Sequence, residues 1–313
     1  MMVLDRRSRD ISHSRFLDFP LLLEEGDVLV FNNSRVIPAR AWGRARNSVV
    51  EFLFVRETDE DTWEALCRPA KKVRPGETIR FSGGLSGLVT EAGREGLRTL
   101  RFSGSVREEL HRSGSAPLPP YIKRKKGTPL REMDLVRYQT IYAEREGSIA
   151  APTAGLHFTE EILNRIKETG VVTAPITLEV GLATFSPVRS DRVEDHHMLS
   201  EDYEIPLESA EKINRAKEEG RSVTAVGTTS VRALESAWEG TVMPGRRSTS
   251  LYIYPGFEFQ VVDRLLTNFH LPQSTLLMLV SAFADVELVQ EAYREAVADA
   301  YRFFSYGDCM FIR

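Results

Sequence analysis

Residues 222–235, with the sequence S-V-T-A-V-G-T-T-S-V-R-A-L-E, decide the fold that we expect for this chain. A β-branched run stops at Gly227, three hydroxyl residues follow it, and an amphipathic run comes next. This order predicts a strand, a tight turn lined by Thr228 and Thr229, and a helix whose N-cap is Ser230. Free backbone N–H groups at the start of such a helix favour an anionic or hydroxyl-rich ligand. Taken alone, the stretch is equally compatible with an ordinary strand-to-helix turn of an α/β protein.

The second half of the chain repeats this alternation of strands and helices. Because short connections between such elements favour a mostly parallel or mixed sheet, we expect an α/β domain with its loops gathered at the strand ends. Ligands of open α/β sheets bind beyond the carboxyl ends of the strands. The other elements expected after residue 151 are a helix capped by Thr159 and ending at Gly170, a strand over 171–180, a helix over 207–219, a strand over 261–269, a helix over 275–284 begun by Ser274, a helix over 288–300 and a strand over 301–312.

The first half has a different pattern of apolar runs and turn residues. A buried strand within residues 27–40 ends in a polar elbow at Asn32, Asn33 and Ser34. From residue 41 to about residue 115, short alternating runs are separated by Gly, Pro and acidic turns, which predicts a small antiparallel sheet or barrel. A Pro-rich run with four cations then has the composition of a hinge. The strands expected in the antiparallel region cover residues 49–55, 63–67, 78–81 and 97–102.

Composition is that of an ordinary globular protein. Of 313 residues, 42% are hydrophobic and 27% are charged, which excludes a disordered chain, and no stretch approaches the roughly 18 consecutive apolar residues that a membrane helix needs. The N-terminus does not resemble a signal peptide, so we expect a cytoplasmic protein without a membrane partner. Residues 1–150 carry 26 Lys and Arg against 21 Asp and Glu, whereas the whole chain has a net charge of −4. A polyanionic partner would therefore meet the first half.

We expect no metal and no disulfide. Cys67 and Cys309 lie far apart, neither belongs to a C-x-x-C pair, and both are interpreted as buried small hydrophobes. His196 and His197 lack the spacing of a zinc-binding helix, and no Gly-rich phosphate or dinucleotide motif is present.

Four loops concentrate the residue types that chemistry uses. His157 and His270 are candidates for acid and base roles, although a lone histidine is more often a hydrogen-bonded structural residue. Arg232 would bind a ligand carboxylate or pair with its neighbour Glu235. The four loops are A-P-T-A-G-L-H-F-T (151–159), E-V-G-L-A-T-F (179–185), G-T-T-S-V-R (227–232) and T-N-F-H-L-P-Q-S-T (267–275).

Seven blocks carry a resemblance to a known family. They are F-N-N-S-R-V-I-P-A-R (31–40), P-L-P-P-Y-I-K-R (117–124), R-Y-Q-T-I-Y-A (137–143), A-A-P-T-A-G-L-H-F-T (150–159), V-G-T-T-S-V-R-A-L-E-S (226–236), L-L-T-N-F-H-L-P-Q-S-T-L-L-M-L-V-S-A-F (265–283) and Y-R-F-F-S-Y-G-D-C-M (301–310). In this order they closely resemble the S-adenosylmethionine:tRNA ribosyltransferase-isomerase family of queuosine biosynthesis. The resemblance implies an α/β main domain with a mixed sheet, here residues 1–40 and 116–313, and an inserted small antiparallel β-barrel domain, here residues 41–115.

The resemblance also implies a reaction. The ribosyl part of S-adenosylmethionine, a substrate here, would be transferred to the aminomethyl group of the base preQ1 at the wobble position of a tRNA anticodon loop. The products would be epoxyqueuosine-tRNA, adenine and methionine, and we expect a monomeric enzyme. Two alternatives remain: another S-adenosylmethionine-dependent transferase on the same scaffold, and a tRNA-binding paralogue without turnover.

Site roles follow from the loops and the resemblance together. His157 and His270 are the acid and base candidates, Arg232 would take the methionine carboxylate, and single-stranded RNA would stack on Tyr121 and Tyr138. The residues expected to hold the nucleoside are Thr153, Gly227, Thr228, Thr229, Ser230 and Asn268. The cations expected to contact tRNA phosphates are Arg35, Arg40, Lys71, Lys72, Lys123 and Arg124, together with Arg74, Lys125 and Lys126.

Three departures from the family pattern weaken the inference of activity. The family begins some two dozen residues earlier, so we expect this chain to lack an N-terminal segment. Glu179 stands where the family has a histidine, a glycine of the same block is replaced, and Leu199 replaces a second histidine. Glu179 is therefore a third catalytic candidate, able to act as a base but not as a cation.

Overall fold

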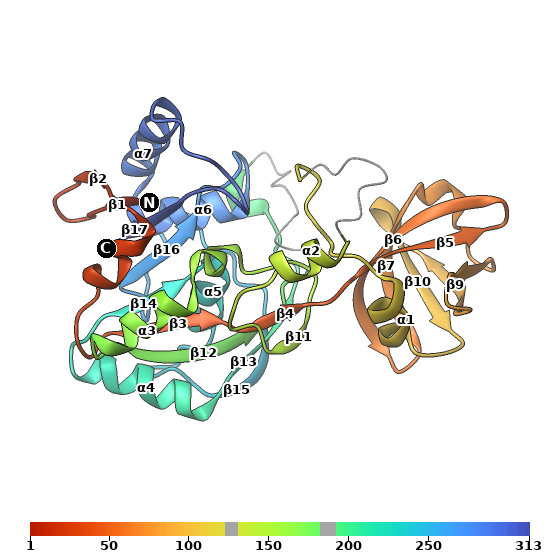
Figure 1. Cartoon of the computed structure of the whole chain (residues 1–313), viewed down its shortest axis with the longest axis horizontal. Helices are drawn as coiled ribbons and strands as arrows, with labels where there is room; N and C mark the ends of the chain where they lie inside the picture. Colours follow the sequence, from red (N-terminus) through yellow and green to blue (C-terminus); the bar gives the residue numbers. More distant parts are fainter. Residues whose placement is uncertain (123–130, 182–191) are drawn as a thin grey trace. The chain divides into compact units, whose positions relative to one another are not determined.

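The computed structural model describes residues 1–122, 131–181 and 192–313. These form two compact units, drawn in Figure 1. The first unit comprises Met1–Ser34, Thr140–Arg145 and Pro152–Arg313, and the second comprises Arg35–Gln139 and Glu146–Ala151. Among the described residues, no helix is long and apolar enough to cross a membrane.

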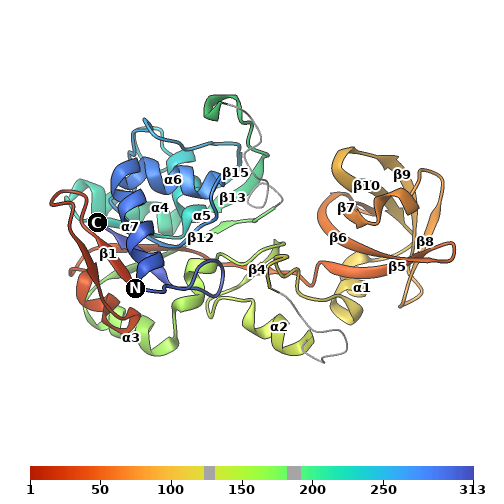
Figure 2. The same ribbon diagram turned by 90° about the horizontal axis from the view of Figure 1, so that it is seen from above.

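A nine-stranded mixed sheet forms the first unit (Figures 1 and 2). Its four central strands are mutually parallel, and the strands at both sides of them include antiparallel neighbours. In spatial order the strands are β15 (Gly245–Thr249), β13 (Glu201–Ile205), β12 (Val172–Leu178), β3 (Val28–Asn32), β14 (Val223–Val226), β16 (Arg264–Asn268), β17 (Cys309–Ile312), β1 (Met2–Leu4) and β2 (Ile11–His13). The predicted mixed α/β sheet is confirmed.

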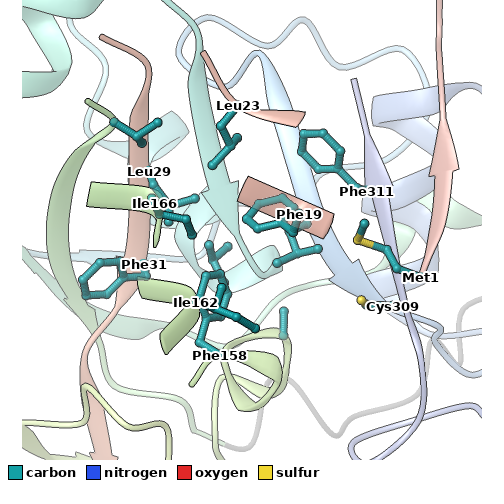
Figure 3. Packing of buried hydrophobic residues seen from close by; sticks show 14 of the residues in the cluster. Met1, Phe19, Leu23, Leu29, Phe31, Phe158, Ile162, Ile166, Cys309 and Phe311 are labelled. Atoms are coloured by element: carbon teal, nitrogen blue, oxygen red, sulfur yellow. The ribbon is translucent and has the colours of Figure 1, made fainter. Parts of the chain in front are cut away.

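Helices cover this sheet. Every residue of β3 and β14 is buried, as expected for parallel strands covered on both faces. The helices of the unit are α3 (Glu160–Glu168), α4 (Leu207–Glu218), α5 (Thr228–Ser236), α6 (Thr275–Ala284) and α7 (Val286–Ala298), with the 3-10 turns η1 (Phe16–Leu22), η4 (Thr153–His157) and η6 (Val193–Asp195). Figure 3 shows one core cluster, in which Phe19, Phe158 and Ile162 pack with the sheet residues Phe31 and Phe311.

A closed antiparallel barrel forms most of the second unit, and it confirms the predicted barrel. Its strands, in order around the barrel, are β10 (Leu97–Phe102), β7 (Thr62–Arg68), β6 (Ser48–Asp59), β5 (Arg40–Ala45), β8 (Thr78–Phe81) and β9 (Ser86–Ala92). The interior holds the aromatic rings of Phe52, Phe54, Phe81 and Phe102. Strands β4 (Ser34–Val36) and β11 (Arg145–Ser148) make a separate two-stranded sheet.

Two barrel strands were not predicted, because each contains a glycine that reads as a strand breaker. A Cβ on Gly43, in β5, would lie 2.6 Å from Ile79, and one on Gly87, in β9, would lie 2.6 Å from Phe102. The missing side chains therefore make room for bulky interior neighbours.

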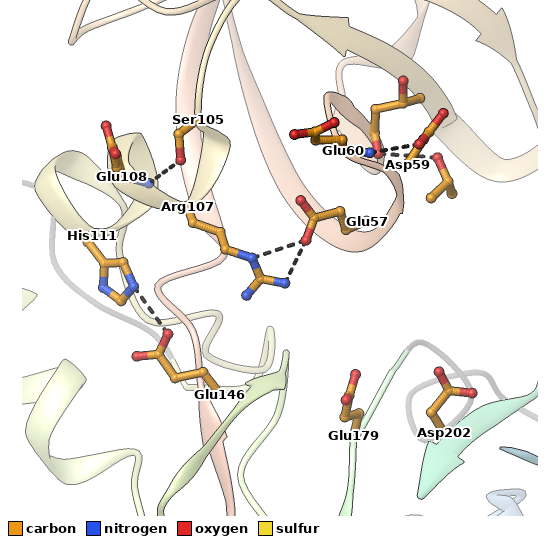
Figure 4. Close-up of polar contacts among 12 residues, drawn as sticks. Glu57, Asp59, Glu60, Ser105, Arg107, Glu108, His111, Glu146, Glu179 and Asp202 are labelled. Carbon is orange, nitrogen blue, oxygen red and sulfur yellow. Dashed lines mark hydrogen bonds and ion pairs between the residues drawn. The ribbon is translucent and has the colours of Figure 1, made fainter. Parts of the chain in front are cut away.

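Two helices of the second unit, α1 (Val106–Ser113) and α2 (Arg131–Arg137), were also not predicted. Figure 4 shows how polar side chains hold α1. The Ser105 hydroxyl caps the helix by accepting the Glu108 N–H at 3.3 Å. Arg107 donates to Glu57 at 2.6 and 3.0 Å, and His111 lies 3.2 Å from Glu146.

Two predictions about local structure were wrong. The N-cap of α5 is Gly227, not Ser230, because Gly227 adopts φ 83°, a conformation that glycine reaches without strain, and the helix begins at Thr228. The closing strand, expected over 301–312, is limited to Cys309–Ile312, since Phe304 has φ 73° and interrupts the extended backbone.

Candidate active site

The four parallel strands of the first unit end side by side. Strand β12 ends at Leu178, β3 at Asn32, β14 at Val226 and β16 at Asn268. We call the sheet border made by these strand ends and the loops after them the carboxyl edge. Three of the four predicted loops, those around Glu179, Gly227 and Asn268, therefore follow three of these four strands (β12, β14 and β16), and the fourth contains η4.

Asn32 joins three elements at the carboxyl edge. Its side-chain Oδ1 accepts the N–H groups of Leu178 and Ser34, both at 3.0 Å. Its Nδ2 donates to the Leu178 carbonyl at 2.9 Å and to Thr229 Oγ1 at 3.4 Å. Asn32 was expected in a polar elbow without a functional role; the available signal was an amide side chain at the end of an apolar strand. The contacts fix the ends of β12 and β3 to the first turn of α5.

Hydroxyl groups line the start of α5. Thr228 and Thr229 are buried in its first turn, and the Ser230 hydroxyl donates to the Val226 carbonyl at 2.8 Å. Ser230 thus faces the end of β14. Gly227 lies close to η4, since a Cβ added to it would be 3.7 Å from the Cβ of Ala154. This proximity brings the loop that carries Thr153 and His157 next to the α5 start.

His157 and Asn268 meet at the carboxyl edge. Asn268 Nδ2 lies 3.4 Å from His157 Nε2 and donates to the Phe304 carbonyl at 3.0 Å. Burial lowers the pKa of His157 to about 4, an effect that nearby Asp308 opposes. The imidazole is therefore neutral at pH 7. Asn268 Oδ1 is buried and has no hydrogen-bond partner among the described residues.

His270 occupies a separate, buried place beyond the end of β16. Its Nε2 lies 2.8 Å from Thr267 Oγ1, and its backbone N–H donates to the Tyr293 hydroxyl at 2.7 Å. Burial lowers the pKa of His270 to about 4 and raises that of Tyr293 to about 12. These contacts are those of a structural histidine that is held neutral.

Tyr142 lies next to η4 and was not among the residues predicted for the site. A Cβ on Gly155, in η4, would lie 2.2 Å from the Tyr142 hydroxyl and 2.7 Å from Thr140. Gly155 therefore allows a close approach between η4 and the segment 140–145. Burial raises the pKa of Tyr142 far above its usual range, and its hydroxyl has no hydrogen-bond partner among the described residues. The glycine before His157 was the signal for this contact.

Arg232 is buried in the second turn of α5, because the helix begins at Thr228. It forms an ion pair with the buried Glu201 carboxylate, and its Nε donates to the Leu251 carbonyl at 3.0 Å. The alternative pairing with Glu235 is wrong. The Glu235 carboxylate instead accepts the backbone N–H groups of Gln260, Val261 and Val262 at 2.9 to 3.1 Å. One terminal nitrogen of Arg232, Nη2, is buried without a partner among the described residues.

Glu179 follows β12 directly and is half-buried. Its carboxylate lies 3.2 Å from Arg246 on β15, and its backbone N–H donates to the Asp202 carbonyl at 2.9 Å. Arg246 supplies a positive charge next to this carboxylate. Figure 4 shows the side chains of Glu179, just after β12, and of Asp202 on the neighbouring strand β13.

The candidate RNA-binding cations belong to the second unit. Lys71 and Lys72 are exposed on the 3-10 turn η2 (Ala70–Lys72), and Arg35 and Arg74 are exposed as well. Arg40 is held by the Leu118 carbonyl at 2.8 Å and by Glu51 at 3.7 Å. The predicted contacts through Lys123, Arg124, Lys125 and Lys126 lie outside the described residues.

Of the two tyrosines expected to stack on bases, only Tyr121 has an accessible ring. Tyr121 is 39% exposed, whereas Tyr138 is 1% exposed in the core of the second unit. The stacking role of Tyr138 is therefore wrong. Both cysteines are buried, as predicted, and burial raises the pKa of each thiol to about 12.

Comparison with known proteins decides the family. The sequence model described as queuosine biosynthesis protein matches residues 1–312. The chain belongs to this family.

Curated relatives cover the whole chain. Proteins named S-adenosylmethionine:tRNA ribosyltransferase-isomerase are 46% identical in Natranaerobius thermophilus, 49% in Clostridioides difficile and 50% in Carboxydothermus hydrogenoformans, and each match spans 100% of this chain and 92% of the relative. A crystal structure of S-adenosylmethionine tRNA ribosyltransferase from Thermotoga maritima matches with a TM-score of 0.54 and 36% identity, over 100% of this chain and 91% of that one. The family and its fold are thus the ones that the seven sequence blocks indicated.

Proposed function

We propose that this protein is an S-adenosylmethionine:tRNA ribosyltransferase-isomerase that acts on preQ1 at the wobble position of tRNA. The observation that carries the proposal is the identity of 46 to 50%, over the whole chain, with relatives of that name. The gathering of the motif loops at one sheet edge supports it, since open α/β sheets bind ligands there. The products would be epoxyqueuosine-tRNA, adenine and methionine.

The chemistry fits neutral side chains at the carboxyl edge. The sulfonium of S-adenosylmethionine acidifies the adjacent C5′ hydrogens, so a base can remove one of them. Adenine then leaves with a proton, the preQ1 amine attacks the activated ribose fragment, and methionine departs. The neutral imidazole of His157 would be the base, and Asn268 would hold its ring in position.

The nucleoside would bind between η4 and the start of α5. Thr153, Thr228 and Thr229 offer hydroxyl groups, and the unpartnered Asn268 Oδ1 is an acceptor for an adenine or ribose donor. Buried polar atoms without partners are rare in folded proteins, so an unpartnered amide oxygen at a ligand edge indicates a contact that the ligand completes.

Arg232 would recognise the methionine carboxylate through Nη2, the terminal nitrogen that Glu201 and Leu251 leave unoccupied. The pair with Glu201 then serves to orient the guanidinium, whose five N–H donors leave those of Nη2 for the ligand. Glu179 remains a second candidate base, and the contact with Arg246 would hold it ionised for that role.

The tRNA would be held by phosphate contacts and base stacking. Lys71, Lys72 and Arg35 are exposed cations of the second unit, and Tyr121 presents a partly exposed ring. A single-stranded anticodon loop allows its wobble base to leave the stack and enter an active site.

The decisive experiment is incubation with S-adenosylmethionine and preQ1-containing tRNA, followed by adenine measurement and mass analysis of the modified nucleoside. We expect stoichiometric adenine and a wobble base heavier by the transferred ribosyl fragment. Adenine formation without the modified base would point to another acceptor. Binding of the tRNA without adenine release would instead identify a paralogue that lacks turnover, and either result contradicts the proposal.

A further inference from the structure

A large cavity lies at the border of the sheet opposite the carboxyl edge. It has a volume of about 730 Å³ and is lined by Asp5, Arg6, Arg7, Lys217, Gly220, Arg221, Ser222, Asp263, Arg264 and Arg313. Ser222 precedes β14 and Arg264 begins β16, whereas Arg313 follows β17, which runs antiparallel to β16. The cavity is therefore at the amino ends of the parallel strands, and we call this border the amino edge.

Positive charge dominates the lining, with six cationic side chains against two aspartates. Three of the cations pair with carboxylates: Arg313 with Asp5 at 3.2 Å, Lys217 with Asp263 at 3.4 Å, and Arg264 with Asp27 at 2.6 Å. The other three, Arg6, Arg7 and Arg221, form no ion pair among the described residues.

Backbone carbonyls hold two of these three arginines. Arg6 donates to the carbonyls of Asp263 at 2.6 Å and Phe283 at 3.2 Å, and its guanidinium lies over the Phe283 ring, 4.2 Å from its centre. Arg221 donates to the Glu25 carbonyl at 2.9 Å. Such contacts fix the position of a guanidinium but leave its full positive charge in place.

Helix ends explain only part of this charge. Cations are favourable near helix C-termini, and Lys217 lies in the last turn of α4 while Arg6 contacts the last turn of α6. Arg7 makes no such contact. Burial lowers the pKa of Arg6, and Arg7 lowers it further although Asp263 and Asp5 oppose both effects. Arg6 and Arg7 thus bring two adjacent positive charges to the cavity lining, next to Asp5 and Asp263.

We propose that the cavity at the amino edge is a second ligand site, which binds phosphate groups through Arg6, Arg7 and Arg221. Guanidinium groups match phosphate oxygens in a bidentate manner, and the volume is within the range of small-molecule sites. The four steps of β16 from Arg264 to Asn268 separate the two edges by about 13 Å. The ligand would therefore not touch the reacting atoms. Its source is either a free phosphate compound or the tRNA backbone outside the anticodon arm.

Calorimetry with inorganic pyrophosphate and the full chain tests the site. The double variant Arg7→Ala/Arg221→Ala should bind pyrophosphate at least ~10-fold more weakly than the unchanged protein, because it loses two phosphate-binding forks. Arg294→Ala, which removes an exposed arginine of α7 that does not line the cavity, is the matched control and should bind normally. Arg7→Ala alone changes an exposed side chain and keeps the test valid if the double variant fails to fold.

Binding of tRNA separates the two sources. If the site takes backbone phosphates, the double variant weakens binding of full-length tRNA, lowers the slope of log affinity against log salt by roughly 2, and leaves an anticodon stem-loop unaffected. If the ligand is a free phosphate compound, pyrophosphate binds while both RNAs bind the variant normally. Adenine release from the stem-loop substrate should be unchanged in either case. Equal binding of both probes by the variant and the unchanged protein, or no pyrophosphate binding together with unchanged tRNA binding, would overturn the proposal.

Discussion

The two edges of the sheet differ in how their charged side chains are paired. At the carboxyl edge the polar groups include amides, hydroxyls and a neutral imidazole, and the charged groups are paired: Arg232 with Glu201, and Glu179 with Arg246. At the amino edge Arg6 and Arg221 are held by carbonyls and keep their charge. In an α/β sheet the positive helix ends lie at the carboxyl edge and the negative ones at the amino edge. The cations of the amino edge therefore complement the negative helix ends, whereas the positive helix ends at the carboxyl edge face neutral polar groups and paired charges.

The largest expected effect comes from leaving Arg232 unpaired. Glu201→Ala should lower the free energy of unfolding by about 3 to 5 kcal/mol, because it leaves the buried guanidinium of Arg232 without its carboxylate partner. Urea denaturation measures the change. Glu204→Ala, at a half-buried position of the same strand, is the control and should cost far less. A loss below that of the control would show that Arg232 does not depend on Glu201.

Removing His157, the proposed base, should abolish most of the activity. His157→Ala is expected to slow adenine release by about 10²-fold or more, the contribution typical of a positioned base. His111→Ala, at an exposed histidine of the second unit, should leave the rate unchanged. Near-normal turnover of His157→Ala would move the role of base to Glu179.

Acid should protonate the buried histidines and weaken the fold. The folded-state pKa of His270 is about 4 against an ordinary value of 6.5, so the unfolded chain binds more protons between these pH values. The free energy of unfolding should therefore fall as the pH is lowered from 6.5 toward 4, by on the order of 3 kcal/mol for this group. Denaturation at pH 7.5, 5.5 and 4.5 measures the slope. His270→Asn should reduce the slope and leave the share of His157, whose pKa is also about 4, whereas His111→Gln should leave the slope as it is; an unchanged slope in His270→Asn would contradict the assignment.

Adding a methyl group at Gly155, where η4 approaches Tyr142 closely, should have a smaller effect on stability. Gly155→Ala is expected to destabilise the protein by about 1 to 3 kcal/mol and to raise the KM for S-adenosylmethionine, because the new methyl group meets the Tyr142 hydroxyl. Combining it with Tyr142→Phe should recover part of the loss. Additive losses in the double variant would show that the two residues do not collide.

The smallest expected effect on stability comes from a substitution at the amino edge, at Arg7. Arg7→Ala should change the free energy of unfolding by no more than about 0.5 kcal/mol, since its side chain is exposed and forms no ion pair within residues 1–122, 131–181 and 192–313. The same denaturation assay as for Glu201→Ala gives a direct comparison of a matched and an unmatched cation. A destabilisation of several kcal/mol would show that Arg7 has a structural partner.

Sequence patterns predicted the elements whose signals are local. The N-caps Thr159 and Ser274 and the bounds of β8, β10 and α6 were placed correctly, because caps and alternation act over a few residues. Strand β13 was not predicted, since E-D-Y-E-I carries three acidic residues and its pairing comes from β12 and β15. The cap of α5 was misplaced because a glycine in positive φ outweighed the preference for serine.

The candidate site was predicted as a set of loops but not as a set of contacts. His157 and Asn268 are 111 residues apart in sequence, and no periodicity indicates that their side chains meet. The pairing of Arg232 with Glu201 was missed for the same reason, because the obvious partner by spacing was Glu235. The sequence blocks shared with the family indicate which loops form the candidate site. The tertiary structure determines which atoms of these loops are available to a ligand.

The two buried thiols give this protein a built-in readout. Cys67 belongs to the second unit and Cys309 to the first, and each thiol has a pKa near 12, so neither reacts with an alkylating reagent while its own unit is folded. Alkylation under increasing denaturant, followed by peptide mass analysis, would report the opening of the barrel unit and of the sheet unit separately. Every variant discussed above can therefore be assigned to the unit it weakens without introducing a label.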